Sequence, residues 1–386
     1  MNETARDNVL GRSLTDPAAI FSGAPLFPVR EIASGKFRNG IAVRMPNHLG
    51  DTVMALPALV SLRALLPRYC ALYAIAPAAF QPLFEAIPEV DGFLPLGRPH
   101  RFWRMKELRN LRMFRAGVGV LFNRSFRDAL MMRCAGIPLL CGPAGRGGAL
   151  FFDRVLRYPP LHPGGAPATR HQARRYFDLA QALGVAGIPA MPHFDFDRLA
   201  GELPDFLRKA VEAKELLVLA PGAAYGPAKR WSARNFHHVA AAWLERGGTV
   251  AAVGGAAEAP AGAECLDGLP ADRAFDFCGK TALGDLMRLL RAARAAVAND
   301  SGVMHLAAAL GTPGVAVFGS TDPAATAPVS AKWRIVAAPP ACAPCLRRKC
   351  PRAAAGDAPE CMAAVAPETV REALDALLSA ENERER

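Results

Sequence analysis

Three kinds of segment are missing from this 386-residue chain. No run of eighteen apolar residues occurs, so the sequence predicts no membrane-spanning helix. The first residues include Glu3, Asp7 and Asp16 and lack a basic start followed by an apolar core, so we expect no secretion signal and a cytoplasmic protein. No Gly-x-Gly-x-x-Gly follows the first predicted strand of either half, which argues against a dinucleotide-dependent oxidoreductase.

A complete phosphate-binding P-loop is also missing. Gly279-Lys280-Thr281 resembles the end of such a loop, but Ala274 stands where its first glycine belongs, and this excludes an ATPase of that class. The apolar fraction of 51% excludes a mostly disordered chain. A chain of this length is too long for one ordinary core and fits two domains.

Acidic residues are fewer than basic ones, and the net charge is +11. The excess is concentrated in residues 98–133, where aromatic and apolar side chains are interleaved with Arg and Lys. Such a surface suits an anionic partner such as a phospholipid headgroup or a phosphorylated glycolipid, although a solvated basic helix is the alternative. We expect no nucleic-acid partner. The candidate acceptor or membrane residues are Arg101, Arg104, Arg112 and Arg115.

Short apolar runs alternate with helical patterns along both halves, which predicts two doubly wound α/β domains. In the first half the predicted strands are 40–44, 69–75, 92–95 and 118–122, with helices over 52–66, 78–87, 102–116, 126–135 and 170–183. In the second half they are 216–220, 249–253, 275–277, 295–298 and 315–318, with helices over 235–246 and 283–293, one starting near residue 302, and one over 367–378. We divide the chain into an N-terminal extension (1–37), a Rossmann-like domain (38–190), a linker region (191–214), a second Rossmann-like domain (215–365), and a helix with a charged tail (366–386). The extension is expected to add to the first domain or to wrap its surface.

The segment 297–310 contains a buried strand that stops at Asn299-Asp300-Ser301-Gly302, where an apolar helix begins. The first turn of a helix offers unpaired N–H groups and the positive end of a dipole, so this junction is a candidate phosphate site. His305 lies one turn further on. An ordinary capped connection between strand and helix explains the pattern equally well.

Three other loops follow predicted strands. Asp51 opens the helix after the first strand, where it caps the helix or acts as a general base. The loop 221–231 brings Gly222 close to a ligand and carries Lys229, a cation that would stabilise a departing diphosphate. Glu258 follows Gly254-Gly255 and would bind a ribose or lie in a polar surface turn.

Four of the nine cysteines are clustered near the C-terminus: Cys342, Cys345, Cys350 and Cys361. In a cytoplasmic protein such a cluster favours a metal knuckle or a redox pair over structural disulfides. The later spacings match no standard zinc site, so a loop held by buried thiols without a metal is an equally good interpretation.

The loops together resemble a known family. Residues 44–59 (RMPNHLGDTVMALPAL) and 299–305 (NDSGVMH) look like motifs of the lipopolysaccharide heptosyltransferases, the family-nine glycosyltransferases. Residues 221–231 (PGAAYGPAKRW) and the clustered cysteines resemble the version found in heptosyltransferase II. Four motifs in the same order make the resemblance specific, and it extends from about residue 40 to the last helix.

The resemblance implies a GT-B fold, two Rossmann-like domains facing across a cleft. It implies inverting transfer of L-glycero-D-manno-heptose from ADP-heptose to the heptosyl-Kdo₂-lipid A inner core, with no cofactor, at the inner face of the inner membrane. Asp51 would be the base and Lys229 the contact of the donor phosphate. The other implied donor-binding residues are Gly222, Glu258, Asp300, Ser301, Gly302, Met304 and His305.

This sequence departs from the family pattern at the N-terminal extension, at His48 where many relatives have Trp, and in the spacing between Cys350 and Cys361. Two other interpretations therefore stay open. One is a heptosyltransferase I-like or III-like enzyme, or a related transferase that uses another nucleotide sugar. The other is a non-catalytic protein that binds a nucleotide or a glycolipid.

Overall fold

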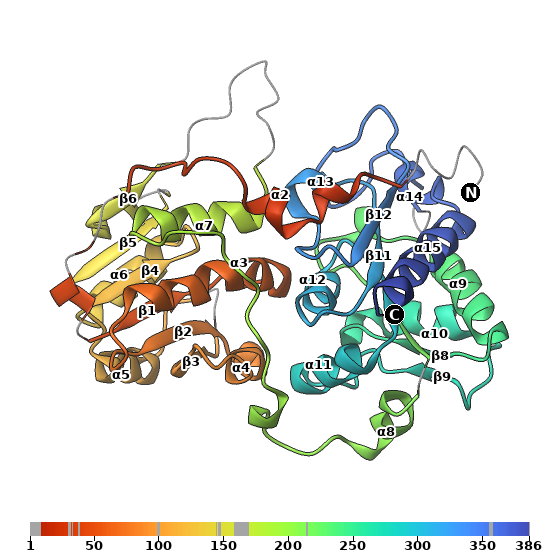
Figure 1. The fold of residues 1–386 in the computed structure, drawn as a ribbon, viewed down its shortest axis with the longest axis horizontal. Helices are drawn as coiled ribbons and strands as arrows, with labels where there is room; N and C mark the ends of the chain where they lie inside the picture. The colour runs from red at the N-terminus through yellow and green to blue at the C-terminus, as the bar shows by residue number, and fades with distance from the viewer. Residues whose placement is uncertain are drawn as a thin grey trace. The chain divides into compact units, whose positions relative to one another are not determined.

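The computed structural model describes residues 9–29, 32, 34–37, 39–98, 101–143, 145, 148–157, 170–213, 215–354 and 358–385. The chain forms two compact units, an N-terminal unit (Phe21–Ala200) and a C-terminal unit that combines Met1–Ile20 with Gly201–Arg386. Each unit contains one parallel six-stranded sheet with helices packed on it (Figure 1). The predicted α/β class with two doubly wound sheets is confirmed.

The sheet of the N-terminal unit has the order β3-β2-β1-β4-β5-β6. Its strands are β1 (Ile41–Arg44), β2 (Leu72–Pro77), β3 (Gly92–Leu96), β4 (Val118–Leu121), β5 (Leu139–Pro143) and β6 (Arg154–Leu156). Its helices are α3 (Leu49–Ser61), α4 (Gln81–Glu85), α5 (Met105–Phe114), α6 (Phe126–Cys134) and α7 (Gln172–Ala182). Helix α3 packs on α7, and α5 packs on α6. The strand order reverses between β1 and β4, which makes their carboxyl ends the expected ligand position.

The sheet of the C-terminal unit repeats this plan in the order β12-β11-β10-β7-β8-β9. Its strands are β7 (Leu216–Ala220), β8 (Thr249–Ala252), β9 (Ala274–Asp276), β10 (Ala295–Asn299), β11 (Gly314–Phe318) and β12 (Trp333–Ala337). Its helices are α8 (Asp205–Val211), α9 (Ala233–Glu245), α10 (Ala259–Leu266), α11 (Leu283–Ala292), α12 (Gly302–Ala309), α13 (Pro323–Thr326), α14 (Glu360–Ala363) and α15 (Pro367–Glu385). Helix α2 (Pro17–Phe21) contains the point in the chain where the two units divide, between Ile20 and Phe21. Here the order reverses between β7 and β10.

The central strands of both sheets are buried along their whole length, which explains their continuous apolar runs. In the C-terminal unit, one face of the sheet shares a core with α9 and α15, built around Trp231, Phe236 and Leu374. Trp231 also donates its indole N–H to the carbonyl of Val365 at 2.9 Å. Removing a side chain of this size from a core typically costs about 3–5 kcal/mol.

Seven strands and α-helices were not predicted from the sequence: β5, β6, β12, α2, α8, α13 and α14. Strand β5 contains Cys141, Gly142 and Pro143, which are weak strand signals, and β6 has only three residues at the sheet edge. Helix α8 lies inside the segment 191–214 that was expected to be a linker region, and the boundary between the two units, after Ala200, falls in the same segment.

The N-terminal extension differs from the expectation that it joins the first domain. Val9 forms an antiparallel bridge with Val336 of β12, and Leu10 donates its N–H to the carbonyl of Ile335 at 3.0 Å. Thr15 Oγ1 donates to the carbonyl of Trp333. An unpaired edge strand offers free backbone groups, so the beginning of the extension is held by the C-terminal unit.

The N-terminal unit begins at the end of α2. The ring of Phe21 lies edge-on to that of Phe177 in α7, and Arg174 donates to the carbonyl of Gly23 at 3.2 Å. Helix α15 ends at Glu385, so the predicted final helix is longer than residues 367–378. No helix in the described ranges is long and apolar enough to cross a membrane.

Candidate functional site

The loop after β10 and the loop after β7 meet at the point where the strand order of the C-terminal sheet reverses. Asn299, the last residue of β10, is completely buried. Its Oδ1 accepts the N–H of Trp231 at 3.0 Å, and its Nδ2 donates to the carbonyl of Pro221 at 2.7 Å. One buried amide therefore fixes both ends of the loop 221–231, which carries Lys229.

Lys229 and Asp300 form an ion pair at this sheet edge. The distance from Lys229 Nζ to Asp300 Oδ2 is 2.6 Å, and the two side chains are 12% and 5% exposed. Thr321 Oγ1 donates to the same Oδ2 at 2.6 Å. An ammonium has three N–H donors, so the bond to Asp300 leaves Lys229 with capacity for an anionic ligand.

The ring of Tyr225 lies close to two cations of the C-terminal unit. Lys229 Nζ is 4.8 Å from the ring centroid, and the guanidinium carbon of Arg348 is 5.1 Å from it. The phenol O–H donates to the carbonyl of Leu346 at 2.9 Å. Tyr225 and Thr321 were not identified from the sequence. The signal for Thr321 is its place soon after β11, whose carboxyl end lies beside that of β10.

Helix α12 begins at Gly302 and is capped by Ser301. The Ser301 hydroxyl accepts the N–H of Met304 at 3.5 Å, which is a long contact. The expected cap is therefore present, and Ser301 and Gly302 at the start of the helix are half-buried. Met304 and His305 are buried, so their side chains pack inside the unit. Their predicted contact with a nucleotide stays a prediction.

Glu258 lies against the loop after β7. Its Oε2 accepts the N–H of Gly255 at 2.6 Å. A Cβ atom added at Gly222 would lie 2.4 Å from Glu258 Cδ, so a larger residue there would displace the end of the Glu258 side chain. The structure thus places Glu258 and Gly222 together at this sheet edge. The hydrogen bond from Gly255 also fits the alternative interpretation, in which Glu258 lies in a polar surface turn and its carboxylate caps that turn.

In the N-terminal unit, Asp51 is the third residue of α3 and is half-buried. It lies after β1, at the point where the strand order of this sheet reverses. Asp51 therefore occupies the position expected for a ligand-facing residue of a doubly wound sheet.

The four basic candidates lie on or beside α5, and all four are exposed. Arg104 and Arg115 flank the helix, and Arg112 donates to the carbonyl of Cys134 at 2.8 Å. The apolar side chains among them are also unusually accessible: Phe102 is 60%, Met105 67% and Met113 75% exposed. The basic surface expected from the sequence is present on this unit, but of the aromatic and apolar side chains interleaved with its arginines, Trp103 and Leu111 are buried in the core.

The clustered cysteines do not form a metal centre in the structure. Over the described ranges, no three His, Cys, Asp or Glu side chains are arranged to hold a metal ion. Only Cys361 of the four is buried, so the alternative of four buried thiols is also wrong. Burial raises the pKa of Cys361, and the nearby thiols of Cys345, Cys350 and Cys342 raise it further.

Residues 104–355 match the model of glycosyltransferase family 9 (heptosyltransferase). Lipopolysaccharide heptosyltransferase 2 of Escherichia coli is 30% identical over 323 residues, which cover 77% of this chain and 87% of that protein. Lipooligosaccharide heptosyltransferase 2 of Haemophilus influenzae is 28% identical and covers 75% of this chain and 86% of its own.

Solved structures agree with these relatives. The structure of E. coli ADP-heptose lps heptosyltransferase II is 27% identical, covers 89% of this chain and 99% of its own, and superimposes with a TM-score of 0.71. A family 9 glycosyl transferase from Veillonella parvula has a TM-score of 0.70 at 21% identity, over 88% of this chain and 97% of its own, and supports the fold alone. The predicted GT-B class of two Rossmann-like units is thus confirmed.

Proposed function

This chain belongs to glycosyltransferase family 9, the heptosyltransferases, and is a glycosyltransferase; from that premise we propose that it transfers heptose from ADP-heptose to the heptosyl-Kdo₂-lipid A inner core of lipopolysaccharide. The observation that carries the proposal is the Lys229–Asp300 pair beside the capped start of α12. A cation and a helix N-terminus at the reversal of a parallel sheet form a site for a diphosphate.

In this proposal the C-terminal unit binds the donor. The diphosphate lies at Ser301 and Gly302, where α12 offers backbone N–H groups, and Lys229 neutralises its charge. Glu258 accepts hydrogen bonds from the ribose hydroxyls, and Gly222 leaves room for it. These cations and dipoles supply the positive charge that a departing ADP needs, so no cofactor takes part.

Asp51 is the general base of the proposed reaction. Its carboxylate takes the proton of one acceptor hydroxyl, and the hydroxyl oxygen forms a bond to the anomeric carbon of the heptose. The bond between that carbon and the ADP oxygen breaks on the opposite side, so the configuration inverts and ADP leaves with the electron pair. General bases contribute roughly 10²- to 10⁴-fold to such steps.

The acceptor is anionic, and the N-terminal unit has positive charge to bind it. A cavity of about 200 Å³ lies beyond the ends of β4 and β5 and beside the first turns of α7. Arg124 and Arg175 line it together with Gln172 and Tyr176, and none of its described lining residues is a carboxylate. A phosphate or carboxylate group of the acceptor fits this chemistry.

The α5 surface, Arg101 to Arg115, is the proposed contact with the membrane that holds the acceptor. Exposed Met and Phe side chains enter the headgroup region, and the arginines pair with anionic lipids. The protein would thus work at the inner face of the inner membrane as a peripheral protein.

The decisive measurement is transfer from ADP-heptose to purified truncated inner-core acceptors. We expect wild type to form product and Asp51→Ala to lose about 10²- to 10⁴-fold in kcat while donor affinity is nearly kept. Competition with GDP-sugars and UDP-sugars tests the donor, and acceptors with and without the first heptose separate a type II enzyme from a type I enzyme. Equal rates for wild type and Asp51→Ala would reject Asp51 as the base. A wild type that binds ADP-heptose but transfers nothing would indicate a non-catalytic binding protein.

A further inference from the structure

Arg44, the last residue of β1, is a charged side chain that is buried completely in the N-terminal unit. Its Nε lies 2.9 Å from Oδ2 of Asp128, and neither side chain has exposed surface. Burial lowers the pKa of Arg44, and the carboxylate of Asp128 opposes this. Two charges without solvent are costly to keep, and replacing them with apolar residues is often neutral or stabilising. Packing alone therefore does not explain the pair.

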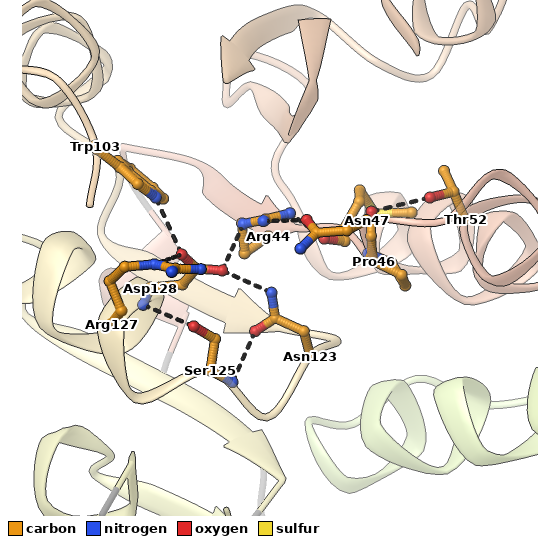
Figure 2. Close-up of polar contacts among 10 residues, drawn as sticks. Arg44, Pro46, Asn47, Thr52, Trp103, Asn123, Ser125, Arg127 and Asp128 are labelled. Atoms are coloured by element: carbon orange, nitrogen blue, oxygen red, sulfur yellow. Dashed lines mark hydrogen bonds and ion pairs between the residues drawn. The ribbon is translucent and has the colours of Figure 1, made fainter. Parts of the chain in front are cut away.

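The guanidinium of Arg44 holds the loop that follows β1 (Figure 2). Its Nη1 donates to the carbonyl of Met45, and its Nη2 donates to Oδ1 of Asn47. From the other end of the loop, Thr52 Oγ1 donates to the carbonyl of Pro46 at 3.0 Å. The backbone between β1 and α3 is thus held at both ends. Asp51 lies in the first turn of α3, directly after this backbone.

Asp128 connects this loop to two further segments of the unit (Figure 2). Its Oδ1 accepts the indole N–H of Trp103 at 3.1 Å, and its Oδ2 accepts from Asn123 Nδ2 at 2.7 Å. Its own backbone N–H donates to the hydroxyl of Ser125, which caps α6. A carboxylate with several donors, on the first turn of a helix, is held in one orientation.

We propose that Arg44 and Asp128 are positioning residues for the transfer reaction, which set the place of the loop 45–50 and thereby of the Asp51 carboxylate. The inference rests on the proposed role of Asp51 as base. A general base must reach its proton within a hydrogen-bond distance, and a displacement of about 1 Å costs on the order of 10²-fold in rate. A buried ion pair that cannot exchange its partners for water keeps such a loop in place.

Arg44→Lys is the first test, because it keeps the charge and removes the fork that reaches Met45 and Asn47. We expect kcat to fall about 10- to 100-fold while the KM for ADP-heptose changes less than about twofold. Arg63→Lys is the matched control. Arg63 pairs with Asp91 at 2.8 Å in the same unit, but both side chains are partly exposed and hold no part of this loop. This variant should keep the wild-type kcat.

Combination with Asp51→Ala separates positioning from general support of the fold. If Arg44 acts through Asp51, Arg44→Lys should have no further effect on the residual rate of Asp51→Ala. Equal losses in both backgrounds, or an unchanged kcat in folded Arg44→Lys, would overturn the inference.

Trp103→Phe provides a milder variant if Arg44→Lys does not fold, since it removes one hydrogen bond from Asp128 and keeps an aromatic ring. It should lower kcat about two- to tenfold without changing the KM for ADP-heptose, and an unchanged kcat would count against the inference.

Failure of the proposed function and failure of this inference give different results. A wild type that transfers no heptose overturns both proposals, whereas an inactive Asp51→Ala together with a fully active Arg44→Lys overturns only this one.

Discussion

The loops after β1 and β10 are each held by a cation and a carboxylate, but the two pairs differ in their access to solvent. Arg44 and Asp128 are 0% exposed, whereas Lys229 and Asp300 are 12% and 5% exposed. The partners of Arg44 are all groups of its own unit. Lys229 is only partly buried, so an arriving phosphate can share its N–H donors. The first pair therefore suits a fixed frame, and the second suits a ligand.

The largest expected difference between the pairs is in stability. Arg44→Met leaves Asp128 buried without its cation, which should lower the free energy of unfolding by about 3–5 kcal/mol. Lys229→Met should lower it by less, because Lys229 keeps some solvent access and Asp300 keeps the hydroxyl of Thr321 as a donor. Urea unfolding of both variants measures this, and equal losses would contradict the distinction.

The next effect is on the donor. Lys229→Met should reduce kcat/KM for ADP-heptose about 10²- to 10³-fold, since a charge that stabilises the departing diphosphate is gone. Lys280→Met is the control, because Lys280 also lies in the C-terminal unit but pairs loosely with Asp276 at 3.9 Å. Steady-state kinetics and ADP titration test this. A wild-type kcat/KM for Lys229→Met would show that Lys229 does not take part in binding the donor.

A smaller change should follow from Thr321→Val, which removes one of the two donors on Asp300 Oδ2. A hydrogen bond to a charged group contributes about 1.5–3 kcal/mol to stability, so the free energy of unfolding should fall by up to about that amount, and ADP affinity, which Thr321 affects only through Asp300 and Lys229, should fall about two- to tenfold. Calorimetric titration with ADP measures it. Thr326→Val, whose hydroxyl donates within α13, should bind ADP as wild type does.

The smallest effect concerns the ion pair of Arg133 and Asp153, whose residues belong to neither loop. Burial raises the pKa of Asp153, but the N–H of Leu140 and the guanidinium of Arg133 outweigh this and hold the pKa below its usual range. The ionised carboxylate therefore stabilises the fold above an ordinary Asp pKa, and this stability is lost as the pH falls through the lower, folded value. Asp153→Asn should therefore be slightly less stable than wild type at pH 7 and as stable as wild type near pH 2. Thermal unfolding of wild type and Asp153→Asn between pH 2 and pH 7 tests this pH dependence. An equal difference in stability between the two proteins at pH 2 and at pH 7 would contradict it.

Much of the arrangement of the candidate donor site was predictable because its residues follow strands. Lys229, Glu258, Asp300 and Ser301 each come soon after an apolar run, and parallel strands bring such positions to one edge. The sequence could not show that Lys229 and Asp300, 71 residues apart, would be paired with each other. Tyr225 lies inside the motif 221–231 and Thr321 soon after β11, but the sequence could not show that either side chain would contact the Lys229–Asp300 pair.

The network around Arg44 was less predictable. Trp103 and Asp128 belong to the segment 98–133, whose arginines indicated a basic surface. In the structure these two side chains are buried and turned toward the sheet. Charge in a segment says little about which of its members face solvent, because that depends on the strand register and on the helices packed above it.

The sequence by itself determined the alternation of strands and helices, the α/β class and the loops that end at Asp51, Lys229 and Asp300. These follow from local patterns of apolar side chains, glycine and helix caps, which are properties of neighbouring residues. Only the tertiary structure decided that Arg44 is buried against Asp128, that the extension pairs with β12, and that the clustered cysteines are not arranged to hold a metal ion. Such contacts join segments far apart in the chain, and their energies depend on burial and distance, which exist only once the sheets have formed.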